Sequence, residues 1–234
     1  MPDNGSAMPL AWSLGAYFLL QVLLNLRLRG VPRNQTDSRS RLLSAAALNG
    51  MLNALFFIAA SSYLIITGKV PAPQLPQPLW AWLLGSIPAG LLLWGLRLRL
   101  RGLGQRIFGG SAFLDPAEQL LREPGSLATL NRSALQLGLL EPLGHELFFR
   151  ACCLALMQSV YGSWPAILAT AIVELLLRLN PAWAISVLVS SAALSGMALA
   201  GGGPLASICT AIVAGFLQSY VTAYQALRSE PPSA

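Results

Sequence analysis

Residues 133–160 read SALQLGLLEPLGHELFFRACCLALMQSV, and this stretch decides the fold. Its length and apolar character are those of a membrane-spanning helix. Four ionisable side chains nevertheless lie inside it: Glu141, His145, Glu146 and Arg150. Each costs a few kcal/mol or more near the centre of a bilayer unless it is paired or faces a polar cavity. The stretch therefore predicts a membrane helix that carries a structural or functional polar site.

The rest of the chain has the composition of a membrane protein. Of its 234 residues 55% are hydrophobic and 10% are charged, whereas a soluble domain has about 25% charged residues. The apolar residues form long blocks without strand-length alternation, which predicts an all-α, polytopic membrane bundle rather than a barrel. We expect about seven transmembrane helices, at residues 9–26, 42–67, 78–98, 133–160, 164–179, 182–200 and 204–226.

The positive charges predict how the bundle is oriented. The net charge of +6 comes mainly from arginines that flank the apolar spans, so it indicates membrane topology and a lipid partner rather than nucleic acid. Arginines are concentrated in the loops 27–41 and 97–132, which we expect to be cytoplasmic, whereas the loop 68–77 has only Lys69. Seven spans then place the N-terminus outside and the C-terminus inside.

The organisation divides near residue 132. We expect an N-terminal region, 1–132, with three transmembrane helices and a cytoplasmic segment, and a core of four helices at 133–228. Within the cytoplasmic segment, Asp115, Pro116 and Glu118 have the pattern of a helix start. A short interfacial helix that ends near Pro124 is the resulting expectation.

The charged residues fall at helical spacing. Glu141 and His145 share one face of a helix, and Glu146 and Arg150 share a neighbouring face, so each pair is within contact distance. Glu146 and Arg150 are expected to form a buried ion pair, since an unpaired charge there would be very costly.

A second pair of the same spacing, Glu174 and Arg178, has two interpretations. Either Arg178 extends to the cytoplasmic interface and Glu174 compensates its charge, or Glu174 faces His145 and completes a polar cavity. The chain has no other histidine than His145, and zinc sites usually use more nitrogen or sulfur ligands, so we expect neither a metal nor a cofactor.

The motif around Pro142, Glu146, Phe149 and Arg150 resembles the first motif of the CPBP family. This family of CAAX proteases and bacteriocin-processing enzymes, also called Abi, has the pattern Pro-x-x-Glu-Glu-x-x-x-Arg. The resemblance covers about residues 133–220. It implies a four-helix core and an intramembrane endopeptidase, in which the first Glu of the pair acts as base. A His on the next helix and a His and an Asn on the last helix complete the family's site.

Four of these family positions differ in this chain. They fall on His145, Arg178, about Thr210 and about Ala214. Arginine is effectively always protonated and cannot act as a base. The resemblance thus implies a degenerate catalytic site.

Two functions from different classes follow. The first is a non-catalytic scaffold or binding partner for another membrane protein or peptide. The alternative is an active peptidase with a rewired site, in which Glu141, His145 and Glu174 take part and Glu146 remains from the family's motif. A transporter would also use buried charges, but the sequence has no inverted repeat to support it.

Overall fold

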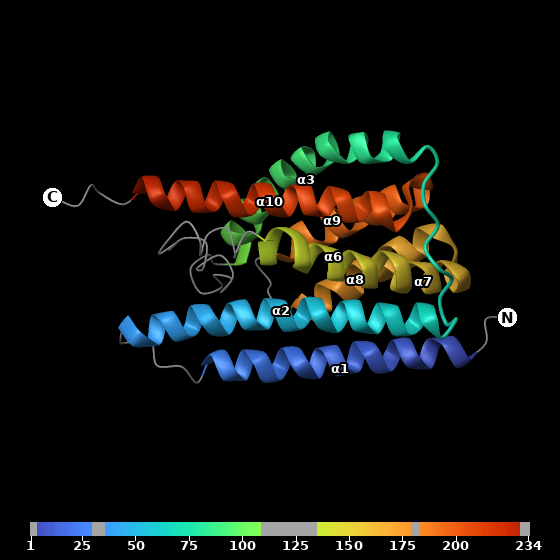
Figure 1. Cartoon of the computed structure of the whole chain (residues 1–234), viewed down its shortest axis with the longest axis horizontal. Coiled ribbons are helices and arrows are strands. Elements are labelled where there is room, and N and C mark those ends of the chain that lie inside the picture. The colour runs from blue at the N-terminus through green and yellow to red at the C-terminus, as the bar shows by residue number, and fades with distance from the viewer. Residues whose placement is uncertain (1–3, 30–35, 109–134, 179–182, 230–234) are drawn as a thin grey trace.

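The regular secondary structure is all helical in the part of the chain that its computed structural model describes, residues 4–29, 36–108, 135–178 and 183–229, in which residues 67–78 form a non-helical connection (Figure 1). The all-α class is therefore confirmed. The domain boundary expected near residue 132 and the interfacial helix expected at 115–124 both lie outside the described residues. The elements are α1 (Asn4–Arg29), α2 (Thr36–Ile66), α3 (Leu79–Phe108), η1 (Gln136–Leu140), α6 (Glu141–Glu146), η2 (Leu147–Cys153), α7 (Leu154–Tyr161), α8 (Ser163–Arg178), α9 (Ala184–Met197), η4 (Ala198–Gly202) and α10 (Gly203–Ser229).

The stretch 136–161 is one continuous helix in which the hydrogen-bond register changes. η1 and η2 are π-helical segments on either side of α6, and the backbone at each junction keeps right-handed helical angles. Pro142 has no backbone N–H and so removes one hydrogen bond within this continuous helix, at the point where the register changes from η1 to α6. Gly162 ends the helix with a positive φ of 78°, a conformation that glycine adopts without strain. π-helical segments are rare and are frequent at functional sites.

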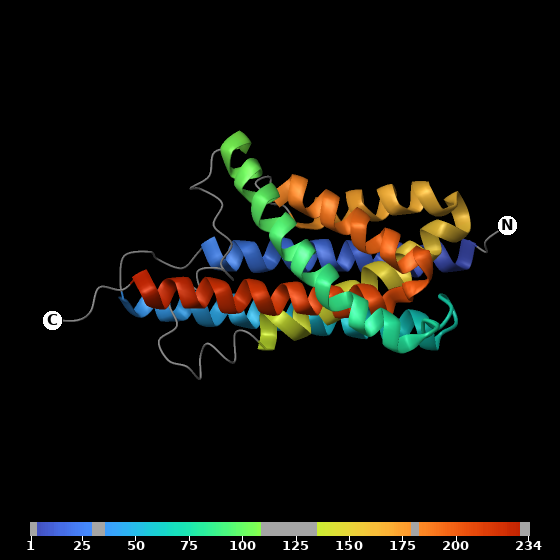
Figure 2. The ribbon, with the colours of Figure 1, turned by 90° about the horizontal axis from the view of Figure 1, so that it is seen from above.

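Successive helical stretches run in alternate directions, as Figure 1 shows, and the two termini lie at opposite ends of the molecule. The stretch 136–161 lies in the centre, where α2 packs against α6 and η2 on one side and α10 packs on the other. α10 in turn packs extensively on α3, which crosses it obliquely in Figure 2. The positive φ values of Gly201 (106°) and Gly203 (58°) turn the chain between η4 and α10.

Two helical stretches of the described chain are long and apolar enough to cross a membrane, Leu79–Ile107 and Ala184–Val221. The second contains the turn at residues 201–203 and so consists of two consecutive helices. The stretches Met8–Leu20, Gly50–Ile66 and Ser163–Leu177 are apolar but shorter.

The surface and the interior of the described chain both mix apolar and polar side chains, although apolar clusters form part of the core. Large apolar residues are exposed on several helices; Ile66, Leu92 and Trp164 are 82%, 76% and 79% exposed. Only 17% of the most apolar part of Leu79–Ile107 is buried. The interior also holds many hydroxyl and charged side chains. Among the buried ones are Ser61, Ser86, Glu146, Arg150, Thr170, Glu174, Ser191, Ser195, Ser207, Thr210 and Ser219.

Candidate functional site

Four side chains from the central helix and α8 form a closed cycle of charges in the interior. Arg150 Nε lies 3.1 Å from Glu146 Oε2, and Arg150 Nη2 donates a hydrogen bond of 3.0 Å to Glu174 Oε2. On the other side, His145 Nδ1 lies 3.6 Å from Glu146 Oε1 and His145 Nε2 lies 3.7 Å from Glu174 Oε1. Each carboxylate oxygen of the two glutamates thus has one nitrogen neighbour. We call these four residues the charge cycle.

The charge cycle is shielded from solvent. The side chains of Glu146, Arg150 and Glu174 are 2%, 0% and 3% exposed, and that of His145 is 11% exposed. His145 packs against aromatic rings: its ring lies edge-on to Phe57 of α2, with centroids 5.6 Å apart, and 4.5 Å from Phe149. These rings hold the imidazole in place, so the cycle is anchored to α2 as well as to α8.

Each charged group of the cycle has an oppositely charged neighbour, but not every donor atom of Arg150 makes a hydrogen bond. The contact of Arg150 Nε with Glu146 Oε2 has ion-pair distance but not hydrogen-bond alignment, and Arg150 Nη1 has no hydrogen-bond partner within the described chain. The cycle carries a charge of −1 with neutral His145 and is neutral when His145 is protonated. Within the described chain no group of three or more His, Cys, Asp or Glu residues could hold a metal ion. Arg150 supplies the positive charge between the two carboxylates.

The other residues singled out in the sequence lie around the cycle. Glu141 is the first residue of α6, one turn before His145, and is half-buried. Arg178 is the last residue of α8, and its side chain lies outside the described residues, so the predicted contact between Glu174 and Arg178 stays a prediction. Glu174 itself faces Arg150 and His145. The polar cavity that the second interpretation adds stays a prediction.

The two α10 positions of the family's motif have neighbours of their own. Thr210 is buried, and its hydroxyl donates to the sulfur of Met197 at 3.3 Å. Ala214 is buried in an apolar cluster with Leu93, Leu194 and Ala211. Neither position offers the imidazole or the amide that the family's pattern has there.

Sequence reasoning missed the contact between Arg150 and Glu174 and the aromatic support of His145. The first joins residues 24 positions apart, so spacing along one helix could not reveal it. The second depends on Phe57, one of several aromatic residues in α2, and the sequence has no signal that selects it.

Comparisons of the chain with protein families, curated proteins and solved structures found no match. The CPBP resemblance therefore rests on the motif residues alone.

Proposed function

We propose that the chain is a seven-span integral membrane protein with its N-terminus outside and its C-terminus in the cytoplasm. The exposed apolar residues and the buried polar ones support this. So does the alternation of seven helical stretches, which is what seven consecutive crossings require. The arginine-rich ends of α1, α2 and α3 and the end of α10 that carries Arg228 lie at one end of the bundle, the end we assign to the cytoplasm.

Within that membrane protein, we infer a CPBP-like core that works by binding rather than by catalysis, as a scaffold or partner of another membrane protein or peptide. The observation that carries this inference is the double engagement of Arg150, whose guanidinium contacts Glu146 and Glu174 at 3.1 and 3.0 Å. A carboxylate held by a cation is a poor base, because protonating it would break the ion pair. The buried cycle is instead suited to fixing how η2 and α8 pack.

A second candidate is a peptidase with a rewired site. It is favoured by His145, whose two nitrogens face two carboxylates at 3.6 and 3.7 Å and whose side chain keeps some exposure. In this alternative, Glu141 or Glu174 with His145 would activate a water molecule, and Glu146 would stay paired with Arg150.

A cleavage assay distinguishes the two functions. The purified protein in detergent is offered peptides that end in a prenylated tetrapeptide and peptides with a bacteriocin leader. We expect no cleavage, since losing one acid–base group commonly lowers a rate by about 10²–10⁴ and several family positions differ here. Cleavage that disappears in both Glu141→Gln and His145→Ala would establish the peptidase and reject the scaffold.

A direct search for the partner completes the test. The tagged protein is purified from gently solubilised membranes, and the proteins that accompany it are identified. The scaffold function predicts a stoichiometric membrane partner that is retained in His145→Ala but lost in Arg150→Ala, because only the second change removes the pairing of both carboxylates. A partner that both variants retain would show that binding does not depend on the charge cycle.

A further inference from the structure

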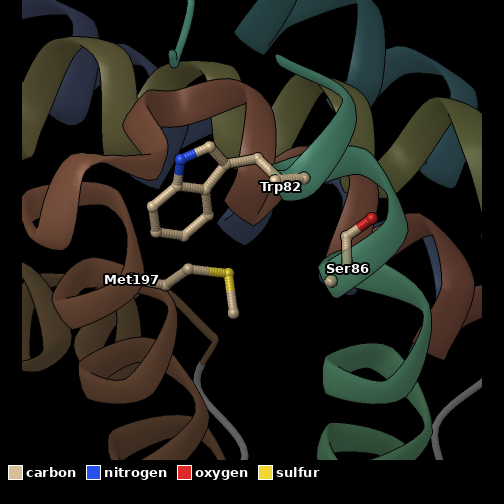
Figure 3. A pocket seen from close by; sticks show the side chains of 5 residues that line it. Trp82, Ser86 and Met197 are labelled. Carbon is tan, nitrogen blue, oxygen red and sulfur yellow. The ribbon is translucent and has the colours of Figure 1, made fainter. Parts of the chain in front are cut away.

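A cavity of about 280 Å³ lies between the start of α3 and the end of α9, away from the charge cycle. Its lining residues are Ala81, Trp82, Gly85, Ser86 and Met197. In Figure 3 the six-membered edge of the Trp82 indole faces Met197 and the indole nitrogen lies on the far side. The Ser86 hydroxyl donates to the Leu83 carbonyl oxygen at 2.7 Å, so its proton is already used. The cavity therefore presents hydrocarbon and thioether surface to an occupant.

Two contacts from α10 and its preceding turn fix the cavity walls. The Trp82 ring lies against Gly202 so closely that a Cβ atom there would come within 2.7 Å of it. On the opposite wall, the sulfur of Met197 accepts the hydrogen bond of Thr210. Both walls are thus held by neighbouring backbone or side chains, as in pre-formed ligand pockets.

The cavity opens to the surface of α3 at Gly85, which lines it and is itself exposed. Leu79, Trp80, Leu83, Leu84 and Ile87 are exposed on the same two turns of the helix. Under the proposed function, on which this inference rests, that surface contacts lipid hydrocarbon. The lining residues lie within about 10 Å of the start of α3, given a rise of 1.5 Å per residue. This depth corresponds to the outer half of the bilayer.

We propose that the cavity binds one acyl chain of a phospholipid from the outer leaflet. Apolar cavities of about 150 Å³ stay dry and accept a benzene-sized group, so a cavity of about 280 Å³ accepts a segment of one chain. A second copy of the protein fits less well, because a stable interface buries on the order of 1,200 Å² or more, whereas this cavity admits only a narrow apolar group.

Two glycine substitutions on α3 test the proposal. A side chain at Gly85 would enter open space in the cavity, and Gly95, almost three turns later, also has open space but does not line the cavity. Wild type, Gly85→Leu and Gly95→Leu are incorporated into nanodiscs of palmitoyl-oleoyl-phosphatidylcholine, released with mild detergent and measured by native mass spectrometry. We expect one retained phosphatidylcholine in wild type and Gly95→Leu, and at least tenfold less retention in Gly85→Leu.

Equal retention in all three proteins, or retention in none, would overturn the cavity assignment. A dimer that Gly85→Leu dissociates would also overturn it, in favour of a second copy. Carbonate extraction of the same membranes separates this result from the proposed function. Chains that stay in the membrane while Gly85→Leu has no effect reject only the lipid site, whereas chains that are extracted reject the membrane function on which the site depends.

Discussion

Arg150 contacts Glu146 through Nε and Glu174 through Nη2, so its guanidinium compensates two buried carboxylates at once. The effect of substituting Arg150 therefore cannot be predicted from the Glu146–Arg150 pair alone. Removing Glu146 and Arg150 together would still leave Glu174 buried, without its guanidinium contact and with His145 Nε2 3.7 Å from its Oε1. The energetic unit is therefore the charge cycle rather than the Glu146–Arg150 pair.

The first prediction concerns that unit. We expect Arg150→Met to lower the free energy of unfolding by about 3–5 kcal/mol, because it removes the cation that contacts both buried carboxylates. A triple variant with Glu146→Gln, Arg150→Met and Glu174→Gln removes all three charges and should be less destabilised than Arg150→Met alone. Thermal and denaturant unfolding in one detergent measures both.

Arg150→Lys is the matched control for this prediction. It keeps the charge but replaces the planar fork by a single ammonium group, which cannot reproduce both contacts. Its stability should lie between wild type and Arg150→Met. A triple variant that is less stable than Arg150→Met would show that the cycle contributes more than charge compensation.

The sequence alone predicts that Glu146 and Arg150 lie close together, because they are four residues apart on one helix. It predicts the other contacts of the charge cycle only in part. Helical spacing relates residues on one helix, and it brought His145, Glu146 and Arg150 to adjacent faces. Which of these faces meets α8 depends on the π-helical register of η2, for which the sequence has no recognisable signal. The contact of Arg150 with Glu174 could therefore not be derived.

At the scale of helices, the seven apolar segments expected from the sequence each coincide with a helical stretch in the described chain. The observed helix ends differ from the expected ones where polar residues continue a helix. The sequence predicts that α3 ends near residue 98, whereas the helix extends to Phe108. Hydropathy detects only the part of a helix that is apolar, whereas backbone hydrogen bonding continues through residues such as Arg99 and Arg106. One such residue also docks the extension, since the Arg101 guanidinium lies 4.6 Å from the Trp183 ring.

The second prediction concerns how two of these helices approach each other. A Cβ atom on Gly144 of α6 would come within 2.7 Å of the Ala54 carbonyl oxygen of α2, a backbone atom that cannot easily move. Close backbone contacts at small residues are typical of helix packing in membranes. We expect Gly144→Ala to destabilise the protein by about 1–3 kcal/mol, as overpacking generally does, measured by thermal unfolding in detergent.

Gly95→Ala is the control for this helix contact. No atom lies within 4 Å of a Cβ atom at Gly95, and the residue is inside α3, so alanine should stabilise the helix by about 0.5–1 kcal/mol. Equal effects of the two substitutions would mean that helix propensity, not the contact of α6 with α2, determines the cost at Gly144.

At the scale of the whole molecule, the position of the termini leads to the third prediction. The N- and C-termini lie at opposite ends of the bundle in Figure 1. With the arginine-rich end in the cytoplasm, a reporter fused after Arg228 should be cytoplasmic and one inserted beside Lys69 should be external. Alkaline phosphatase and green fluorescent protein fusions, which are active on opposite sides, measure this. External activity of the fusion after Arg228 would reverse the orientation, and equal behaviour of both fusions would require an even number of crossings between them.

The exposed apolar residues and the buried hydroxyl groups also determine which substitutions this chain can accumulate over evolution. In a lipid environment, Leu, Ile, Val and Phe can replace one another at exterior sites such as Leu92, whereas aspartate there would cost about 3 kcal/mol at mid-membrane depth. Interior serines such as Ser191 and Ser195 have no such freedom, because larger side chains would not fit. Neutral substitutions should therefore be frequent at exterior positions, but most should exchange one apolar residue for another. Homologues that have diverged far in sequence would keep small residues at these interior positions, and these would be the better markers for finding them.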